Sequence, residues 1–180
     1  MAQPKYAKVD PADYKRLREY EWIAKKGRNS FYTVRYTAKN KAGNAGRIYM
    51  HKEIIKVPQQ MVVDHVNHDG MDNRRANLRA ATRAQNIRNR KKFCNSSGSK
   101  YKGAYENKKQ KRWIARIMFE KKSIYLGCFR NEIDAAKAYD RAAMKYHGEF
   151  ASPNFPASAE RLSVVLAGLR LWMRRQAFRR

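Results

Sequence analysis

The surplus of basic over acidic side chains constrains this 180-residue chain more than any other feature. The chain carries 41 lysines and arginines against 15 aspartates and glutamates, a formal net charge of +26. Because 43% of its residues are hydrophobic, it can fold as one domain or as a few very small ones with thin cores. A folded chain that repels itself this strongly is typical of a protein that binds a polyanion, and nucleic acid is the first expectation.

The positive charge is spread over the whole chain. Residues 1–60, 61–98, 99–160 and 161–180 carry net charges of +9, +5, +6 and +6. This spread disfavours a neutral enzyme with one basic arm and favours several modules laid along one polyanion. An anionic membrane is the competing partner, but no run of about 18 apolar residues is long enough to span a bilayer. The first ten residues lack the apolar core of a secretory signal, so we expect neither secretion nor a membrane partner.

Sequence patterns in the first half predict short elements of both kinds. We expect a helix at 13–22, a β-hairpin formed by 30–37 and 47–51, a helical turn at 52–55 and a strand at 61–65. A turn-rich stretch at 67–73 then leads into a helix at 75–90. The residues expected to be buried in that helix are Ala76, Leu78, Ala81 and Ile87.

The second half follows a Ser-rich linker at 94–99 and has a different pattern. Strands are expected at 102–107, 112–119 and 122–129, followed by an amphipathic helix at 132–147. In the middle strand Trp113, Ala115 and Ile117 are predicted to face the helix, which leaves Arg112, Ile114, Arg116 and Met118 outward. An apolar stripe with arginines marks a last helix at 160–178, which either caps the fold and touches DNA or lies on a membrane surface.

The residues best suited to catalysis lie in and just beyond the predicted strand at 61–65. Hydrolysis of a phosphodiester requires a base for the attacking water and a positive clamp for the phosphate, which a divalent cation on oxygen ligands supplies. Asp64 is a suitable ligand, and His65 is a suitable base because neutral imidazole accepts a proton near neutral pH. Asn86 can return a neutral oxygen to the same ion.

These residues resemble the H-N-N variant of the HNH nuclease motif, a ββα-metal fold of phage and intron-borne homing endonucleases. The matching residues are Asp64-His65, Asn77 and Asn86, with support from Asp72-Asn73-Arg74, Asn77-Leu78-Arg79 and Met50-His51. The resemblance implies that His65 is the general base, that Asp64 and Asn86 bind one Mg²⁺ or Mn²⁺, and that Asn77 holds the hairpin that orients His65. It also implies products with 5′-phosphate and 3′-hydroxyl ends. Asn86 replaces the final histidine of many HNH enzymes, which favours a hard, oxygen-preferring ion over zinc.

Neighbouring polar residues have simpler interpretations. Asn73 and Asn77 are also typical turn and cap residues. We expect His68 and Asp72 to be solvated turn residues, and His51 to be a hydrogen-bonded partner within the hairpin rather than a second base. Two cysteines, Cys94 and Cys128, cannot form a disulfide framework or a four-thiolate zinc site.

The second half resembles the plant ethylene-response-factor DNA-binding domain of the APETALA-two type, which also occurs attached to phage HNH nucleases. The matching residues are Gly103, 112–117, 125–129, 135–143 and Asn154-Phe155. In that family the sheet lies in the major groove, which by position implies contacts from Tyr105, Asn107, Arg116, Met118, Ser123 and Tyr125. Because Tyr105, Met118, Ser123 and Tyr125 replace arginines or tryptophans of plant members, the plant target sequence is not carried over.

The sequence therefore predicts an α+β protein: a ββα-metal HNH core plus a three-stranded antiparallel sheet packed on one helix. Its expected parts are a hairpin region at 1–60, the HNH motif at 61–93, a linker at 94–100, the sheet-and-helix domain at 101–156 and a basic helix at 157–180. The residues expected to contact DNA are Arg74, Arg75, Arg88, Arg90, Lys91, Lys92, Tyr105, Asn107, Arg112, Arg116 and Tyr125.

The predicted function is a site-specific homing endonuclease that acts on double-stranded DNA as a monomer or homodimer. Its expected location is the cytoplasm of a bacterial or phage-infected cell. Two alternatives stay open, a sequence-specific DNA-binding regulator with an inactive HNH site and a structured RNA-binding protein.

Overall fold

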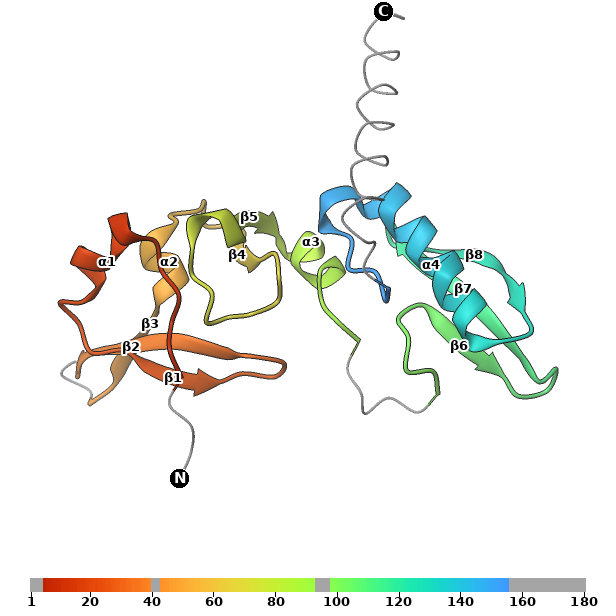
Figure 1. Cartoon of the computed structure of the whole chain (residues 1–180), viewed down its shortest axis with the longest axis horizontal. Coiled ribbons are helices and arrows are strands. Elements are labelled where there is room, and N and C mark those ends of the chain that lie inside the picture. Colours follow the sequence, from red (N-terminus) through yellow and green to blue (C-terminus); the bar gives the residue numbers. More distant parts are fainter. Residues whose placement is uncertain (1–4, 40–42, 93–97, 156–180) are drawn as a thin grey trace, which may run out of the picture.

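Short helices and small antiparallel sheets make up the chain, which confirms the predicted α+β class. The computed structural model describes residues 5–39, 43–92 and 98–155. The first half contains α1 (Pro11–Leu17), β1 (Ile23–Lys26), β2 (Phe31–Lys39), β3 (Ala45–Tyr49), α2 (Met50–Ile54), β4 (Met61–His65), the 3₁₀ turn η1 (Arg75–Asn77), β5 (Leu78–Thr82) and α3 (Arg83–Arg88). The second contains β6 (Ala104–Asn107), β7 (Arg112–Phe119), β8 (Lys122–Phe129), α4 (Glu132–His147) and η2 (Gly148–Phe150). The halves lie side by side with α3 between them (Figure 1).

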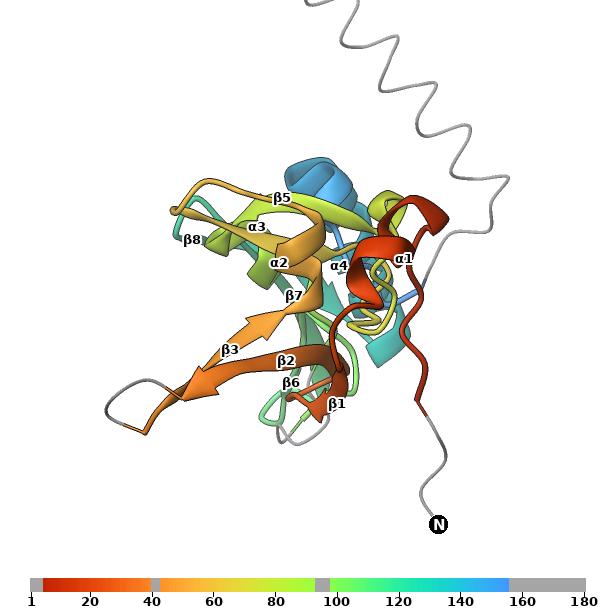
Figure 2. The same cartoon turned by 90° about the vertical axis from the view of Figure 1, so that its left-hand side faces the viewer.

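The first half has one hydrophobic core under its helices. Strands β1, β2 and β3 form an antiparallel sheet, of which the β2–β3 hairpin projects away from the rest (Figure 2). The core joins α1, α2, β4 and β5 through Leu17, Met50, Ile54, Val63 and Leu78. The hairpin region and the HNH segment therefore share one apolar core.

Two predicted helices of this half have different limits from those expected. Helix α1 begins at Pro11, whose ring presets the first-turn backbone, and it ends at Leu17 rather than Trp22. The Trp22 indole donates instead to the Leu17 carbonyl at 2.8 Å, which satisfies one of the free carbonyls at the end of the helix. Helix α2 starts at Met50, so the predicted turn at 52–55 is shifted towards the N-terminus. Strand β1 was not expected at all.

The predicted helix at 75–90 is wrong in its first half. Residues 78–82 form β5, an antiparallel partner of β4 that pairs His65 with Leu78 and Asp64 with Arg79. The helix starts only at Arg83, where Thr82 and Gln85 form a reciprocal capping box. Leu78 and Ala81 are buried as predicted, but Ala76 is exposed and Ile87 is 56% exposed.

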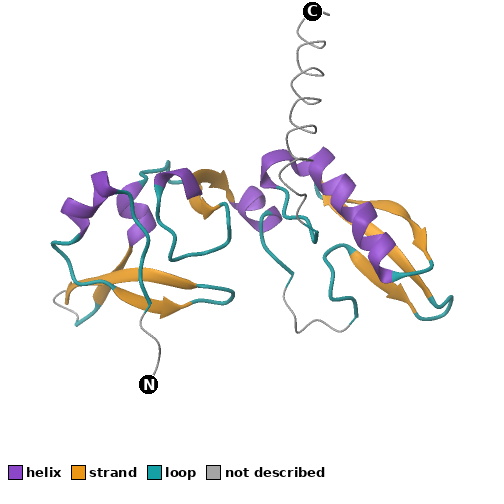
Figure 3. Ribbon diagram, in the orientation of Figure 1, coloured by secondary structure: helices purple, strands orange, loops and turns teal. Residues whose placement is uncertain are grey.

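The second half confirms the predicted sheet and helix (Figure 3). Strands β6, β7 and β8 form a meander, and α4 covers one face. Small alanines on α4 let it approach the sheet closely, and the core contains Ala104, Ala115, Ile117 and Tyr139. As expected, Ala115 and Ile117 are buried on β7, whereas Arg112, Arg116 and Met118 point outward. The predicted helix at 160–178 lies outside the described residues.

Asn131 and Gly148 fix the two ends of α4. The Asn131 side chain accepts a hydrogen bond from the Asp134 amide at 2.8 Å. Gly148 follows the helix with a φ of +55°, a backbone conformation that redirects the chain into η2. The segment after the helix consequently turns back towards α3 (Figure 1). Among the described residues no helix is both long and apolar enough to cross a bilayer.

Gly103, just before β6, offers a sharp test of the packing between sheet and helix. It has a φ of +76°, and a methyl group added there would overlap the ring of Tyr139. We predict that Gly103→Ala lowers the free energy of unfolding by about 2 kcal/mol more than Gly43→Ala, because overpacking adds to the backbone strain. Gly43 is the matched control, since its φ is +78° but no atom of the described residues lies within 4 Å of an added methyl.

Chemical denaturation followed by near-ultraviolet circular dichroism measures both variants. Equal losses would mean that the contact of Gly103 with Tyr139 does not limit packing of the sheet on the helix.

Candidate active site

A cleft of about 790 Å³ is lined by three of the predicted catalytic and metal-binding residues, Asp64, His65 and Asn86, and by several residues that were not predicted. Asn77, also predicted, does not line it. Its walls come from the β1–β2 turn, β2, β3, α2, β4 and α3. The side chains suited to acid–base chemistry or metal binding that line it are Asp64, His65, His51, His68, Asn86 and Asn89. Its basic lining consists of Arg28, Lys52, Arg90 and Lys91. Positive charge around one buried carboxylate suits a cleft that admits a polyanion.

Asp64 is buried near the end of β4 and is held by two side chains. Arg79, its partner across the β4–β5 pair, donates from Nε to Oδ2 at 3.0 Å, and its Nη2 lies 2.9 Å from the same oxygen. Asn89 donates from Nδ2 to Oδ1 at 3.1 Å and to Oδ2 at 3.0 Å. A buried carboxylate requires such partners to remain ionised. Asn89, which follows α3 directly, was not predicted.

His65 is the last residue of β4 and is also buried. Its Nε2 lies 3.4 Å from Oδ1 of Asn73, and its ring packs edge-on against Tyr32 at a centroid distance of 5.9 Å. Burial lowers the pKa of His65 below the ordinary value of 6.5, while the hydrogen bond with Asn73 and the charge of Asp64 oppose that shift. The imidazole is therefore neutral at pH 7 and retains a lone pair that can accept a proton.

Asn77 closes the loop that begins at His65. Its Oδ1 accepts from the Asn67 amide at 3.0 Å, and its Nδ2 donates to the Asp72 carbonyl at 2.7 Å. Its own carbonyl accepts from the Val66 amide at 2.9 Å. These three bonds tie both sides of the loop together directly beside His65.

The prediction that Asp72 is a solvated turn residue is wrong. Its side chain is 1% exposed and accepts from Nε of Arg74 at 2.8 Å, from Nη2 of Arg74 at 2.7 Å and from Nδ2 of Asn67 at 2.9 Å. These bonds, led by that of Arg74, lower the pKa of Asp72 to about 2. Lys8, far away in the sequence, braces the same loop through backbone bonds with Met71 and Asn73.

Two histidines also differ from expectation. His51 lies in α2, stacked on Tyr49 at 5.2 Å and edge-on to His65 at 5.0 Å, and no described residue pairs with its buried Nδ1. Burial lowers the pKa of His51 to about 3. His68 is half-buried, and its Nε2 lies within hydrogen-bonding distance of the Asn89 carbonyl and of Ser152 Oγ. The interpretation of His68 as solvated, and of His51 as hydrogen-bonded within the hairpin, is therefore wrong.

The arginines and lysines predicted to touch DNA occupy varied surroundings. Arg74 pairs with Asp72, and Arg75 donates to both oxygens of Asp13 at 2.7 and 2.8 Å, so both arginines already hold the fold together. Arg90 and Lys91 line the active-site cleft. Lys92 donates to the Tyr101 carbonyl at 2.9 Å.

Of the other predicted contact residues, Arg88 lies on α3, and the rest share the open face of the second sheet. The strand register pairs Tyr105 with Ile114, Asn107 with Arg112, and Arg116 with Tyr125. Tyr105 and Tyr125 are 55% and 57% exposed. This face therefore presents a row of aromatic and basic side chains on the side away from α4.

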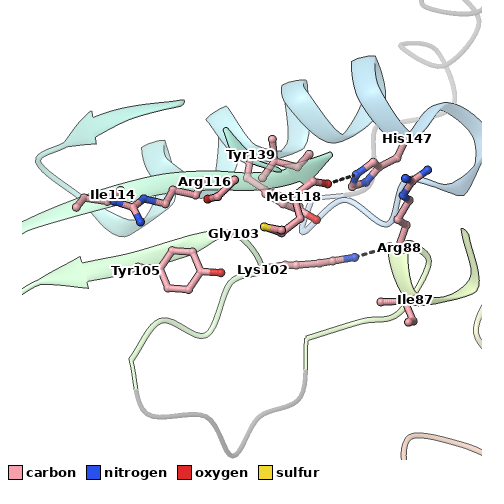
Figure 4. A pocket seen from close by; sticks show the side chains of 12 residues that line it. Ile87, Arg88, Lys102, Gly103, Tyr105, Ile114, Arg116, Met118, Tyr139 and His147 are labelled. Carbon is pink, nitrogen blue, oxygen red and sulfur yellow. Dashed lines mark hydrogen bonds between the residues drawn. The ribbon is translucent and has the colours of Figure 1, made fainter. Parts of the chain in front are cut away.

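One end of that face borders a second cleft of about 530 Å³ next to α3 (Figure 4). Arg88 lines it from α3, and Arg116 lines it from β7. Lys102 Nζ donates to the carbonyls of Arg88 and, at 2.8 Å, of Arg90, so that a positive charge closes the end of α3. Burial lowers the pKa of Lys102 to about 8.

In comparisons with known proteins, an HNH family model matches part of the first half, and plant proteins match one small domain. A family model described as HNH endonuclease matches residues 56–88, which include β4, β5 and α3. An uncharacterised HNH endonuclease of Acanthamoeba polyphaga mimivirus is 32% identical over 142 residues, covering 76% of this chain and 67% of the viral protein. The chain belongs to the HNH endonuclease family.

This HNH family member also contains a region similar to plant AP2/ERF proteins. APETALA2-like protein 2 of Oryza sativa subsp. indica is 54% identical over 50 residues, which are 26% of this chain and 12% of the plant protein. Ethylene-responsive transcription factor WRI1 of Arabidopsis thaliana is 44% identical over 62 residues, 33% of this chain and 14% of its own. The similarity to these plant proteins therefore concerns one small domain, and the sheet packed on α4 is AP2-like.

Buried Asp72 provides a test of how the active-site loop is held. We predict that Asp72→Asn lowers the free energy of unfolding at pH 7 by about 2 kcal/mol, because the pKa is about 2 in the folded state against 3.8 in the unfolded state. Since this pKa is lowered on folding, the stabilisation is complete above pH 4 and is lost as the pH falls towards 2.

Urea denaturation of both proteins between pH 7 and pH 2.5 measures the difference. If the variant's loss in free energy of unfolding stays constant over this range, the ion pair of Asp72 with Arg74 is not the source of that loss.

Proposed function

We propose that this HNH family member is a site-specific DNA endonuclease of the homing type. It hydrolyses a phosphodiester with one divalent cation and His65 as general base, and it leaves 5′-phosphate and 3′-hydroxyl ends. The observation that carries the proposal is the position of Asp64 and His65, adjacent at the end of β4 and lining one cleft with Asn86. A protein that only binds DNA has no need of this buried pair.

His65 has the environment that a general base requires. Its lowered pKa keeps the imidazole neutral at pH 7, so it does not have to lose a proton before it can accept one from water. With Nε2 donating to Asn73 Oδ1, the lone pair lies on Nδ1. Asn77 acts through the loop, because its bonds to the Asn67 amide and the Asp72 carbonyl fix the chain that carries His65.

The side chains present fit a hard divalent cation. HNH endonucleases typically use a divalent metal ion. Although no group of three or more His, Cys, Asp or Glu side chains in the described ranges is arranged to hold a metal, Asp64 and Asn86 offer two oxygen donors in one cleft. Mg²⁺ commonly takes one or two protein oxygens and completes its shell with water and substrate phosphate. The bound cation would stabilise the negative charge that develops on the phosphate and the leaving oxygen.

Binding to double-stranded DNA is assigned mainly to surfaces outside the catalytic pair. The open face of β6, β7 and β8 carries the predicted contact residues of the AP2-like domain, and Arg90 and Lys91 line the catalytic cleft. Such a division places sequence reading on the sheet and backbone contact near the scissile phosphate. The described residues contain one such site, so a single copy is expected to nick DNA and a dimer to cut both strands.

Removal of the catalytic pair tests the proposed chemistry. We predict that His65→Ala and Asp64→Asn each lower the single-turnover rate of Mg²⁺-dependent nicking of supercoiled plasmid by about 100-fold or more, because each removes a group acting in the transition state. Glu120→Gln, in the exposed turn between β7 and β8, removes a carboxylate that does not line the cleft and serves as the control.

Wild-type protein that leaves plasmid DNA intact in Mg²⁺ and in Mn²⁺, yet binds duplex DNA tightly, would support the regulator with an inactive site. Preference for RNA in a competition at matched salt would support the RNA-binding alternative.

The open sheet face yields a separate prediction about affinity. Replacing Arg116 and Tyr125, which pair across β7 and β8, with alanine should weaken duplex binding about tenfold, because a charged and an aromatic contact are both lost. Lys137→Ala on the exposed side of α4 removes the same charge from another face and should change affinity less than about threefold.

Fluorescence anisotropy at fixed salt compares the two variants. Equal effects would mean that the sheet contributes only general positive charge.

A further inference from the structure

The short segment that follows α4 contacts the nuclease half beside its active site. Arg79 on β5 donates from Nη1 to the Glu149 carbonyl at 2.7 Å. Its guanidinium also lies 4.0 Å from the ring centre of Phe150, a buried residue of η2. Figure 1 shows the end of α4 and η2 against α3, on the side where the two halves meet.

The same guanidinium holds the proposed metal ligand. Arg79 Nε and Nη2 both lie within 3.0 Å of Oδ2 of Asp64, so one rigid, planar group spans the distance between Asp64 and Glu149. The Arg79 side chain is only 16% exposed, which leaves it little room to turn independently of either partner. A shift of η2 would therefore change the orientation of the Arg79 guanidinium relative to Asp64.

A second route leads from the same segment to the same carboxylate. Ser152 Oγ lies 3.2 Å from Nε2 of His68, and that nitrogen also contacts the Asn89 carbonyl. The Asn89 side chain then donates to both oxygens of Asp64 and, at 3.1 Å, to the His65 carbonyl. Among the described side chains, Arg79 and Asn89 are the donors to Asp64, and each is linked to the segment after α4.

We propose that residues 148–152, which belong to the AP2-like half, position Asp64 for metal binding and thereby control the rate of DNA cleavage. This inference rests on the proposed function, in which Asp64 holds the cation. Arg79, His68, Asn89, Phe150 and Ser152 are positioning residues, because their side chains act through Asp64, whereas Glu149 takes part through its backbone carbonyl alone. Docking of the DNA-reading half against α3 is then a condition for a competent cutting site, separate from its contribution to affinity.

The size of the effect follows from the behaviour of other metal sites. Groups that hold metal ligands from behind commonly change metal affinity or activity by about 10- to 100-fold when they are removed. Two converging routes end on one carboxylate here, so loss of both contacts at the far end should weaken Mn²⁺ binding about tenfold. The charge next to Asp64 does not change in such a variant, which separates orientation from simple electrostatics.

The full-length protein tests this with three variants. The double variant Phe150→Leu with Ser152→Ala removes the ring that lies against the Arg79 guanidinium and the hydroxyl that contacts His68. Arg79→Lys keeps the charge but loses the planar guanidinium, and with it the bond to the Glu149 carbonyl. Glu149→Gln is the matched control, because its side chain is exposed and its carbonyl remains. Three quantities are measured: Mn²⁺ affinity without DNA by electron paramagnetic resonance of the free ion, duplex affinity in EDTA, and the single-turnover cleavage rate at saturating DNA.

The expected result is about tenfold weaker Mn²⁺ binding and about tenfold slower cleavage in the double variant and in Arg79→Lys. Duplex affinity should stay within twofold of wild type, and Glu149→Gln should match wild type throughout. Unchanged Mn²⁺ affinity and rate in folded variants would overturn the inference, and so would a rate loss that merely follows lost DNA affinity.

Two further outcomes are decided by the same experiment. If the double variant unfolds at the assay temperature, Ser152→Ala alone and Arg79→Lys decide, since neither removes a buried apolar group. A wild-type protein that neither binds Mn²⁺ nor cuts DNA contradicts the proposed function itself, and the inference is then wrong with it.

Discussion

The need to provide hydrogen-bond partners for one buried carboxylate organises much of the first half of this protein. Asp64 is buried, and its charge is stabilised by Arg79 from β5 and by Asn89 after α3. Arg79 lies on β5 and Asn89 directly follows α3. Strand β4, strand β5 and helix α3 must therefore assemble before Asp64 has its full set of hydrogen bonds. The loop that follows β4 positions His65, because Asn77 ties its two sides together. The contacts that stabilise the fold in this region are therefore the same contacts that position Asp64 and His65.

Several basic side chains have partners inside the fold, although the chain as a whole carries a formal net charge of +26. Arg74, Arg75 and Arg79 pair with buried carboxylates, and Lys102 closes the end of α3. The halves each have their own small apolar core, and polar contacts around α3 join them. These basic side chains thus stabilise the chain itself, while the net surplus is left for a polyanionic partner.

Much of the fold could be predicted where local patterns decide it. Strand 61–65 is a short apolar run, and the strands of the second sheet and helix 132–147 have alternating or helical periodicity of their own. The structure confirms all of them. Residues 78–82 could not be assigned locally, because the spacing of Leu78 and Ala81 suits a helix, whereas pairing with β4 makes them a strand. Strand β1 is fully exposed and has no apolar alternation that could reveal it.

The site shows the same division between local and distant information. The Asp64-His65 pair, Asn77 and Asn86 were predicted, and the structure brings Asp64, His65 and Asn86 to one cleft. Asn89, Asn73, His51 and buried Asp72 were missed, since their roles depend on contacts across the fold that no short motif encodes. One signal was present in the sequence for Asp72. It is followed directly by Asn73, Arg74 and Arg75, and an acid next to two arginines in a turn indicates an ion pair.

The central claim is that Asp64 and Asn86 bind the divalent cation and that His65, in the same cleft, is the general base. Its most direct test is the anomalous scattering of Mn²⁺ in crystals of the full-length protein bound to duplex DNA. The account predicts one peak about 2 Å from a carboxylate oxygen of Asp64 and from the amide oxygen of Asn86, next to a DNA phosphate. A cleft without such a peak at millimolar Mn²⁺, or a peak coordinated by other side chains, would contradict it.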